Sequence, residues 1–257
     1  MKNILANYHT HTARCGHASG SDREYVEAAV ESGFQILGFS DHSPMIFKSC
    51  YKSNFRVPAE RAEEYFNSIL SLKEEYKNKI EIHVGVEVEY YPHMFEDYEK
   101  YIHSFPCEYL ILGQHFVFDE EKTASVFNPN DDVERLKGIY DNLIAAVRTE
   151  KFLYVAHPDS IKFTGPSEVF LKEAERFIKV AREYNIPLEI NRLGLHDGRN
   201  YPRKDFWKIV GEYGNPVIIG ADAHNPEALK DYEYLQGCVD LAKECRVNLI
   251  KNNLLNL

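Results

Sequence analysis

The sequence predicts an α/β barrel that forms one domain. Short apolar segments of strand length alternate about seven times with longer amphipathic segments, and this order favours parallel strands joined by right-handed helical crossovers. The length of 257 residues is long for an ordinary domain but normal for a barrel. No linker, repeat or shift in composition divides the chain, so we expect residues 1–257 to form a single domain. A closed barrel would gather the carboxyl ends of its strands on one rim.

The first helix is marked by signals at both of its ends. Ser21 and Glu24 form the Ser-x-x-Glu pattern of a capping box, which is typical of a helix start. Gly33 is typical of a helix end. Residues 34–39 are then expected to form a short buried strand that leads directly to His42.

A long polar loop precedes the second helix. Residues 48–56 carry aromatic and basic side chains, and we interpret this loop as either a lid over a site or a structural connection. The helix that follows has four apolar residues at helical spacing, which are expected in the core: Tyr65, Ile69, Leu72 and Tyr76. Its acidic residues between positions 60 and 75 are expected on a solvated face.

Residues 80–89 alternate strictly between apolar and polar side chains, which predicts a strand. An amphipathic surface strand would show the same pattern. If helices cover the apolar face, Glu87 and Glu89 point into the barrel near its rim, where buried carboxylates need cations as partners. We favour this second interpretation because other strands end in the same kind of residue.

The remaining elements follow from the same periodicities. Helices are expected at residues 94–104, 133–149, 168–184 and 205–213, and strands at residues 109–113, 152–156, 187–192 and 216–220. Pro158 forbids further strand pairing and favours an extended backbone at His157.

Residues with metal-binding side chains follow most of the predicted strands. His9 and His11 come after the apolar residues 4–6 and, two positions apart, point to the same side. His17 follows a Cys-Gly step that can turn the chain back towards them. Similar residues stand past the other strand ends: His42, Glu87, His115, His157, Asp222 and His224. Incidental surface histidines would explain one such pair, but not the repetition, so the sequence predicts a polynuclear metal site on the rim.

Composition limits the classes of partner. The chain carries 40 acidic and 30 basic residues, a formal charge of −10, and no basic run longer than two. This balance disfavours a broad nucleic-acid interface but allows a small phosphate ester. No stretch is long and apolar enough to cross a membrane, and no signal peptide is expected. The five cysteines are scattered without a Cys-x-x-Cys pair, which favours reduced thiols in the cytoplasm.

Six short motifs together resemble the PHP (polymerase and histidinol phosphatase) superfamily. They are His9-x-His11, Ser40-Asp41-His42, Gly85-Val86-Glu87, Gly113-Gln114-His115, Ala156-His157-Pro158-Asp159 and Ala221-Asp222-Ala223-His224. The segment HTHTARCGH and the sequence Glu189-Ile190-Asn191-x-x-Gly194-Leu195 look most like the stand-alone histidinol-phosphatase branch. The resemblance implies a distorted seven-stranded (β/α)7 barrel with three divalent metal ions at the carboxyl rim.

The resemblance also implies a ligand set, which is complete in this sequence. One metal would be held by His9, His11, Glu87 and Asp222; a second by Glu87, His115 and His157; and a third by His17, His42 and His224. Zinc, manganese and iron all suit such mixed ligands. Asp41 and Asp159 are expected to accept hydrogen bonds from ligating histidines.

The implied activity is hydrolysis of a phosphate monoester, most specifically L-histidinol phosphate to L-histidinol and phosphate in histidine biosynthesis, through a hydroxide that bridges two metals. The catalytic candidates are Glu87, Asp222 and His224, and either of the last two, or a metal-bound water, could protonate the leaving group. For the phosphate we nominate Arg192 first and then Lys162 and Arg199. Glu89 and Asp197 are candidate contacts for the cationic part of the substrate.

Three alternatives remain open at this point. A phosphoesterase that acts on nucleotides or another small phosphate ester is the first of them. A metal-binding domain without turnover is disfavoured because all nine ligand positions are filled. An amidohydrolase is disfavoured because Glu87, rather than a lysine, stands where two metals would be bridged.

Overall fold

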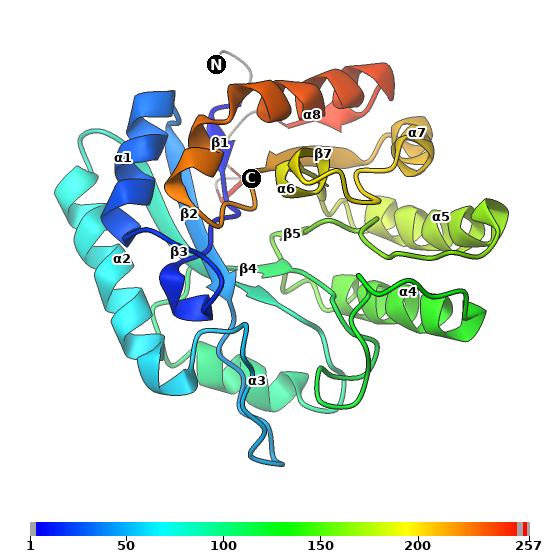
Figure 1. Cartoon of the computed structure of the whole chain (residues 1–257), viewed down its shortest axis with the longest axis horizontal. Helices are drawn as coiled ribbons and strands as arrows, with labels where there is room; N and C mark the ends of the chain where they lie inside the picture. The colour runs from blue at the N-terminus through cyan, green and yellow to red at the C-terminus, as the bar shows by residue number, and fades with distance from the viewer. Residues whose placement is uncertain (1–3, 251–253, 256–257) are drawn as a thin grey trace.

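The computed structural model describes residues 4–250 and 254–255. The described residues form one sheet of parallel strands in chain order (Figure 1). The strands are β1 (Ala6–Asn7), β2 (Ile36–His42), β3 (Glu81–Val88), β4 (Tyr109–Leu112), β5 (Tyr154–Val155), β6 (Leu188–Asn191), β7 (Pro216–Gly220) and β8 (Asn248–Leu249). Every neighbouring pair is parallel, as the alternating pattern predicts.

Helices connect the strands and cover the outside of the sheet (Figure 1). They are α1 (Asp22–Ser32), α2 (Ala62–Tyr76), α3 (Phe95–Ile102), α4 (Val133–Val147), α5 (Ser167–Glu183), α6 (Arg192–His196), α7 (Lys204–Tyr213) and α8 (Tyr232–Glu244), with short 3-10 helices η1 (Ala13–Cys15), η2 (Ala59–Arg61) and η3 (Pro226–Lys230). Within the described residues, no helix is long and apolar enough to span a membrane.

The sheet curls until its first strand meets β7. Thr10, just past β1, forms a parallel bridge with Ala223, just past β7. The His11 backbone N–H donates to the Ala223 carbonyl at 2.9 Å, and the Ala223 N–H donates to the His9 carbonyl at 3.2 Å. These bonds join the carboxyl ends of β1 and β7, which confirms the predicted distorted barrel. The short β8, which the sequence pattern did not indicate, pairs with the first residues of β7.

Apolar residues occupy both faces of the sheet. The outer face packs beneath the helices and includes Ile82, Val84, Val86 and Val88 of β3. The base of the barrel interior is filled mainly by three tyrosines: Tyr8, Tyr109 and Tyr154. The alternation in β3 therefore has the predicted orientation, with Glu87 inside the barrel.

Local sequence signals explain the helix boundaries. The capping box of α1 is present, because Ser21 accepts from the Glu24 N–H and Glu24 accepts from the Ser21 N–H, and Gly33 ends the helix with φ 80°. The expected apolar stripe of α2 is buried. The predicted strand 187–192 extends one residue beyond β6 at each end, and β6 stops at Asn191 because the Asn191 side chain accepts from the Gly194 N–H and starts α6.

Candidate metal centre

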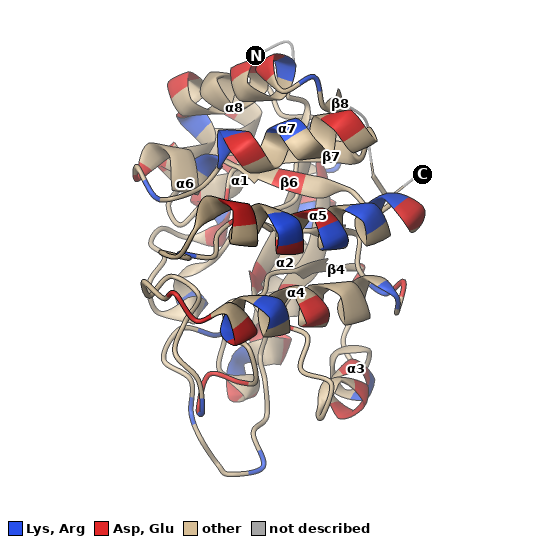
Figure 2. Cartoon of the chain, turned by 90° about the vertical axis from the view of Figure 1, so that its right-hand side faces the viewer, with Lys and Arg blue, Asp and Glu red and all other residues tan. Residues whose placement is uncertain are grey.

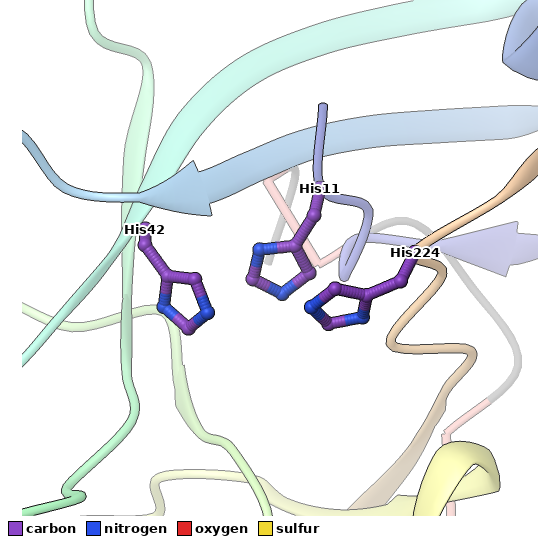
Figure 3. A group of neighbouring side chains, drawn as sticks. All are labelled: His11, His42 and His224. Carbon is purple, nitrogen blue, oxygen red and sulfur yellow. The ribbon is translucent and has the colours of Figure 1, made fainter. Parts of the chain in front are cut away.

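Nine residues from different parts of the chain meet at the carboxyl rim of the barrel. They are His9, His11, His17, His42, Glu87, His115, His157, Asp222 and His224. The strand register contributes directly, since it places His42 of β2 beside Glu87 of β3. Figure 3 shows the rings of His11, His42 and His224 turned towards one another, and their nitrogens form one of the groups that could hold a metal ion.

Glu87 lies at the centre of this group and is 1% exposed. Its Oε1 is 2.9 Å from His157 Nε2, and its Oε2 is 2.9 Å from His42 Nδ1. Three further histidine Nε2 atoms lie 3.7–3.8 Å from its carboxylate oxygens: those of His9, His11 and His115. One carboxylate thus faces five imidazoles, an arrangement suited to cations shared between them.

Asp222 forms a second carboxylate centre beside the first. Its Oδ1 is 3.2 Å from His11 Nε2, 3.5 Å from His9 Nε2 and 3.4 Å from His224 Nδ1. The backbone of Asp222 has φ 49°, a conformation that is uncommon for residues other than glycine and that clusters at functional sites.

His17 joins the group from the turn after η1. Its Nε2 is 3.0 Å from the Nε2 of His224, and both side chains line the same pocket. The expected return of the chain after the Cys-Gly step is observed, because Gly16 adopts φ 84° as it ends η1.

Three carboxylates orient three of the histidines from behind. His9 Nδ1 is 2.8 Å from Glu189 Oε1, His11 Nδ1 is 3.3 Å from Asp41 Oδ1, and His115 Nδ1 is 2.7 Å from Glu89 Oε1. Because ionised carboxylates only accept, each Nδ1 carries a proton, and Nε2 is the atom directed inwards that would offer a lone pair to a metal when the ring is neutral. Asp41 was expected in this role.

The inward nitrogens support metal binding by this set. His9 Nε2 and His11 Nε2 are fully buried and have no hydrogen-bond partner, which is costly unless another group binds them. Divalent cations would satisfy these atoms together with the carboxylates. The donor set therefore fits metal ions.

The charge states also suit cations. Burial opposes ionisation of Glu87 and Asp222, but the surrounding histidines hold the pKa of both carboxylates well below its usual range. Burial and the charge on His11 lower the pKa of His224 to about 3. The carboxylates around His9, His11 and His157 outweigh burial and raise the pKa of these three rings, that of His11 to about 9. Because neutral imidazoles and anionic carboxylates are the forms that bind metals, a bound cation would displace a proton from each of these rings.

Two glycines leave room for carboxylates inside the barrel. A Cβ at Gly113 would overlap the side chain of Glu87, and a Cβ at Gly220 would overlap that of Glu189. Glycine at these positions is therefore required by the close approach of a neighbouring strand's carboxylate.

A pocket of about 530 Å³ opens in front of the cluster. One wall consists of candidate ligands, including Glu87 and Asp222. The rest of the lining is largely aromatic, with Phe55, Phe116, Phe127 and Tyr201, and it also includes Asp197 and Arg199. The pocket thus combines a metal-binding wall, an apolar wall and one carboxylate–guanidinium pair.

Two nominated phosphate contacts lie away from this pocket. Arg192 is 4% exposed and forms an ion pair with Asp231, because the start of α6 turns its side chain away from the rim. Lys162 is exposed and is not among the residues that line the pocket. Arg199, which was ranked below Arg192, does line it.

Glu89 and Asp159 have other roles than those expected. Glu89 is 1% exposed. Its two oxygens accept hydrogen bonds from Arg56 and His115, so they do not face the pocket where a substrate would bind. Asp159 Oδ2 accepts from Trp207 Nε1 at 3.0 Å and from a backbone N–H, so it orients no ligating histidine.

The backbone at His157 also differs from the expectation. Its φ is 32° instead of the extended value favoured before proline. The His157 N–H donates to Glu189 Oε2 at 3.1 Å, and its Nε2 meets Glu87, so contacts on both sides of the residue override the local preference. Glu189 was not predicted as part of the site, although it is the one charged residue of β6 and could have indicated it.

Comparison with known proteins agrees with this geometry. Residues 7–193 match the PHP domain family model, which covers more than half of the chain. The protein therefore belongs to the PHP domain family.

Its relatives include histidinol-phosphatases. A probable histidinol-phosphatase of Deinococcus radiodurans is 29% identical over 235 residues, covering 86% of this chain and 87% of that protein. The histidinol-phosphatase of Bacillus subtilis is 24% identical over 84% of this chain and 92% of its own. A crystal structure of histidinol phosphate phosphatase from Lactococcus lactis, complexed with zinc, L-histidinol and phosphate, has a TM-score of 0.75 at 19% identity and covers 98% of this chain and 97% of its own.

Proposed function

We propose that this protein is a metal-dependent phosphomonoesterase that hydrolyses L-histidinol phosphate to L-histidinol and phosphate in histidine biosynthesis. The observation that carries the proposal is the central position of Glu87, whose carboxylate faces five imidazoles at the floor of an open pocket. The histidinol-phosphatases among the relatives cover most of the chain and support the choice of substrate.

We propose three divalent ions, held by the ligand set implied by the family. One candidate group, His9, His11 and Asp222, supports the ligands proposed for the first ion. Glu87 groups with His9 and His157 and also with His42 and His115, so its carboxylate lies between residues assigned to different ions. Zinc, manganese or iron would suit these ligands. Bound ions would lower the pKa of water and offset the negative charge of the phosphate.

The residues of the chain itself would divide the remaining work. Glu87 would bind two ions, since its carboxylate lies near His9 and His11 on one side and near His157 and His115 on the other. Asp222 and His224 both line the pocket. Because the pKa of each lies below its usual range, either would have to take up a proton from the attacking water before it could protonate the leaving oxygen.

Arg199 and Asp197 are the proposed contacts for a substrate with charges of both signs. They pair with each other, with Arg199 Nη2 2.7 Å from Asp197 Oδ2. A guanidinium matches phosphate oxygens, and a carboxylate suits the ammonium of histidinol. The rings of Phe127 and Tyr201, whose centres lie 6.2 Å apart in a stacked arrangement, would pack against the imidazole of the substrate.

The alternative is a phosphoesterase for nucleotides or other small phosphate esters, and the same stacked rings favour it because they would also accept a base. A long nucleic acid is not the expected partner. In Figure 2, acidic and basic segments alternate along α5 and α7, with no continuous basic strip on the described part of that face.

We also propose that residues 1–257 form one domain and that the enzyme acts in the cytoplasm, since its five cysteines are all free thiols.

The direct test is phosphate release by protein loaded separately with Mn²⁺, Zn²⁺ and Fe²⁺. L-histidinol phosphate should give a kcat/KM above about 10⁴ M⁻¹s⁻¹, well above that of an aryl phosphate or a nucleoside monophosphate. Equal and low values on all three substrates would contradict the proposed substrate. A higher value for the nucleotide would favour the alternative.

A further inference from the structure

Arg56 is a buried cation on an irregular segment, residues 43–58, between β2 and η2. Its side chain is 2% exposed. A guanidinium is rarely buried so deeply unless several partners bind it, because the loss of hydration is large. The loop that carries it is anchored at the rim, since the Val57 N–H donates to the His42 carbonyl at 3.1 Å and the Ser43 N–H donates to the Glu87 carbonyl at 2.9 Å.

Two buried carboxylates bind this guanidinium from different parts of the chain. Arg56 Nη2 donates to Glu89 Oε2 at 2.7 Å, and Arg56 Nε donates to Glu120 Oε2 at 2.7 Å. Both carboxylate side chains are 1% exposed. Glu89 follows β3 and Glu120 lies in the loop after β4, so Arg56 connects its own loop with two others.

Glu89 extends this connection to a candidate metal ligand. Its second oxygen, Oε1, accepts from His115 Nδ1 at 2.7 Å. The result is a continuous chain of charge-assisted hydrogen bonds: Glu120, Arg56, Glu89 and His115. Because Glu89 holds the proton on Nδ1, it leaves His115 Nε2 free to face Glu87, whose Oε1 is 3.8 Å away.

The residue before Arg56 reaches the pocket itself. The Arg56 guanidinium carbon lies 4.6 Å from the centre of the Phe55 ring. That ring meets the His42 ring edge to face at 5.2 Å and lines the pocket. Fixing Arg56 therefore fixes an aromatic wall residue against a second candidate ligand.

We infer that Arg56 is a positioning residue: through Glu89 it fixes the orientation of His115 as a metal ligand, and it locks the 43–58 loop over the site at the same time. The inference rests on the proposed metal-dependent function. Without the guanidinium, Glu89 Oε2 would lose the hydrogen bond that fixes it, and the Glu89 carboxylate would be free to turn away from His115 Nδ1. Arg56 thus links closure of the pocket to the affinity for one metal ion.

The test measures Zn²⁺ affinity by titrating metal-stripped protein against a competing chelator. Arg56→Met should weaken binding of one ion by about 10- to 100-fold, the usual effect of removing an outer hydrogen-bond partner. Glu89→Gln should have a similar effect. The double variant should be no weaker than Glu89→Gln alone, because both substitutions break the same connection.

Arg203→Met is the matched control. Arg203 also stacks over an aromatic ring, with its guanidinium carbon 4.0 Å from the centre of the Phe170 ring, and it also pairs with a carboxylate, that of Asp205. Among the described contacts its side chain meets no candidate ligand, and the bond from its backbone N–H to Asp159 is kept in the variant. A residue that is merely structural would lower the Tm without changing the metal affinity of the folded protein.

The outcomes separate the inference from the proposed function. Three results would each overturn the inference. Arg56→Met could bind Zn²⁺ with wild-type affinity, it could lose no more affinity than Arg203→Met, or the losses of Zn²⁺ affinity in the double variant could be additive. If Arg56→Met does not fold, Arg56→Lys is tested instead. Lysine keeps the positive charge but lacks the planar fork that faces two carboxylates, so the Zn²⁺ affinity should still fall. Wild-type Zn²⁺ affinity in Arg56→Lys would overturn the inference. A wild-type protein that binds no Zn²⁺ would instead overturn the proposed function.

Discussion

Replacing Gly113 by alanine places a methyl group against the central carboxylate of the site. An ideal Cβ at this position would lie 2.5 Å from Glu87 Cδ and 2.7 Å from Glu87 Cγ. Carbon atoms in contact are separated by about 3.5 Å, so the carboxylate must move by roughly 1 Å. Metal–oxygen distances tolerate only about 0.2 Å. The displacement is therefore about five times what coordination allows.

We expect Gly113→Ala to lose at least one metal ion per chain and to lower kcat/KM by about 100-fold or more, the usual consequence of misplacing a catalytic group by 1 Å. The assay combines metal analysis after desalting, phosphate release and the Tm. Gly237→Ala in α8 is the control, because its Cβ meets only the end of the Leu195 side chain, at 2.9 Å. Wild-type metal content and activity in Gly113→Ala would refute the role assigned to Glu87.

Three further predictions follow from the same geometry. Arg199→Ala should lower kcat/KM for L-histidinol phosphate by about 10- to 100-fold with unchanged metal content, since hydrogen bonds to charged groups contribute about 1.5–3 kcal/mol. A loss of kcat/KM no larger than that caused by Arg182→Ala, at an exposed position, would count against Arg199 as a substrate contact. Glu189→Gln should weaken metal binding by about 10- to 100-fold, measured by chelator competition, and unchanged affinity would argue against its hold on His9. Removing the metals with a chelator should lower the Tm by about 5–10 °C for each ion lost, because one ion at 100 times its Kd contributes about 2.7 kcal/mol and each kcal/mol shifts the Tm by about 2–4 °C in a domain of this size. Calorimetry that shows no shift would contradict binding to the folded state.

The barrel and the rim cluster could be predicted because they depend on local periodicity. The alternation of apolar and polar residues places Glu87 inside the barrel, and the parallel order brings His42 beside it. Each strand end contributes independently, so an error of one or two residues in a boundary does not move a ligand away from the rim.

The parts that were not predicted depend on contacts between distant residues. Arg192 directly follows a strand, but the cap formed by Asn191 turns the chain into α6 and the arginine pairs with Asp231 instead. Glu89 was correctly placed inside the barrel, yet its partner Arg56 lies in a loop without periodicity, so no pattern connects the two. The φ of 32° at His157 likewise arises from Glu189 and Glu87, which a local rule for residues before proline does not include.

The most direct test of the metal centre is a crystal structure of manganese-loaded protein with phosphate, in which anomalous scattering locates the metals. We predict three peaks at the rim, two of them within bonding distance of the Glu87 carboxylate and one beside His17, His42 and His224, with phosphate between the metals and Arg199. Absence of any metal next to Glu87 would contradict the account.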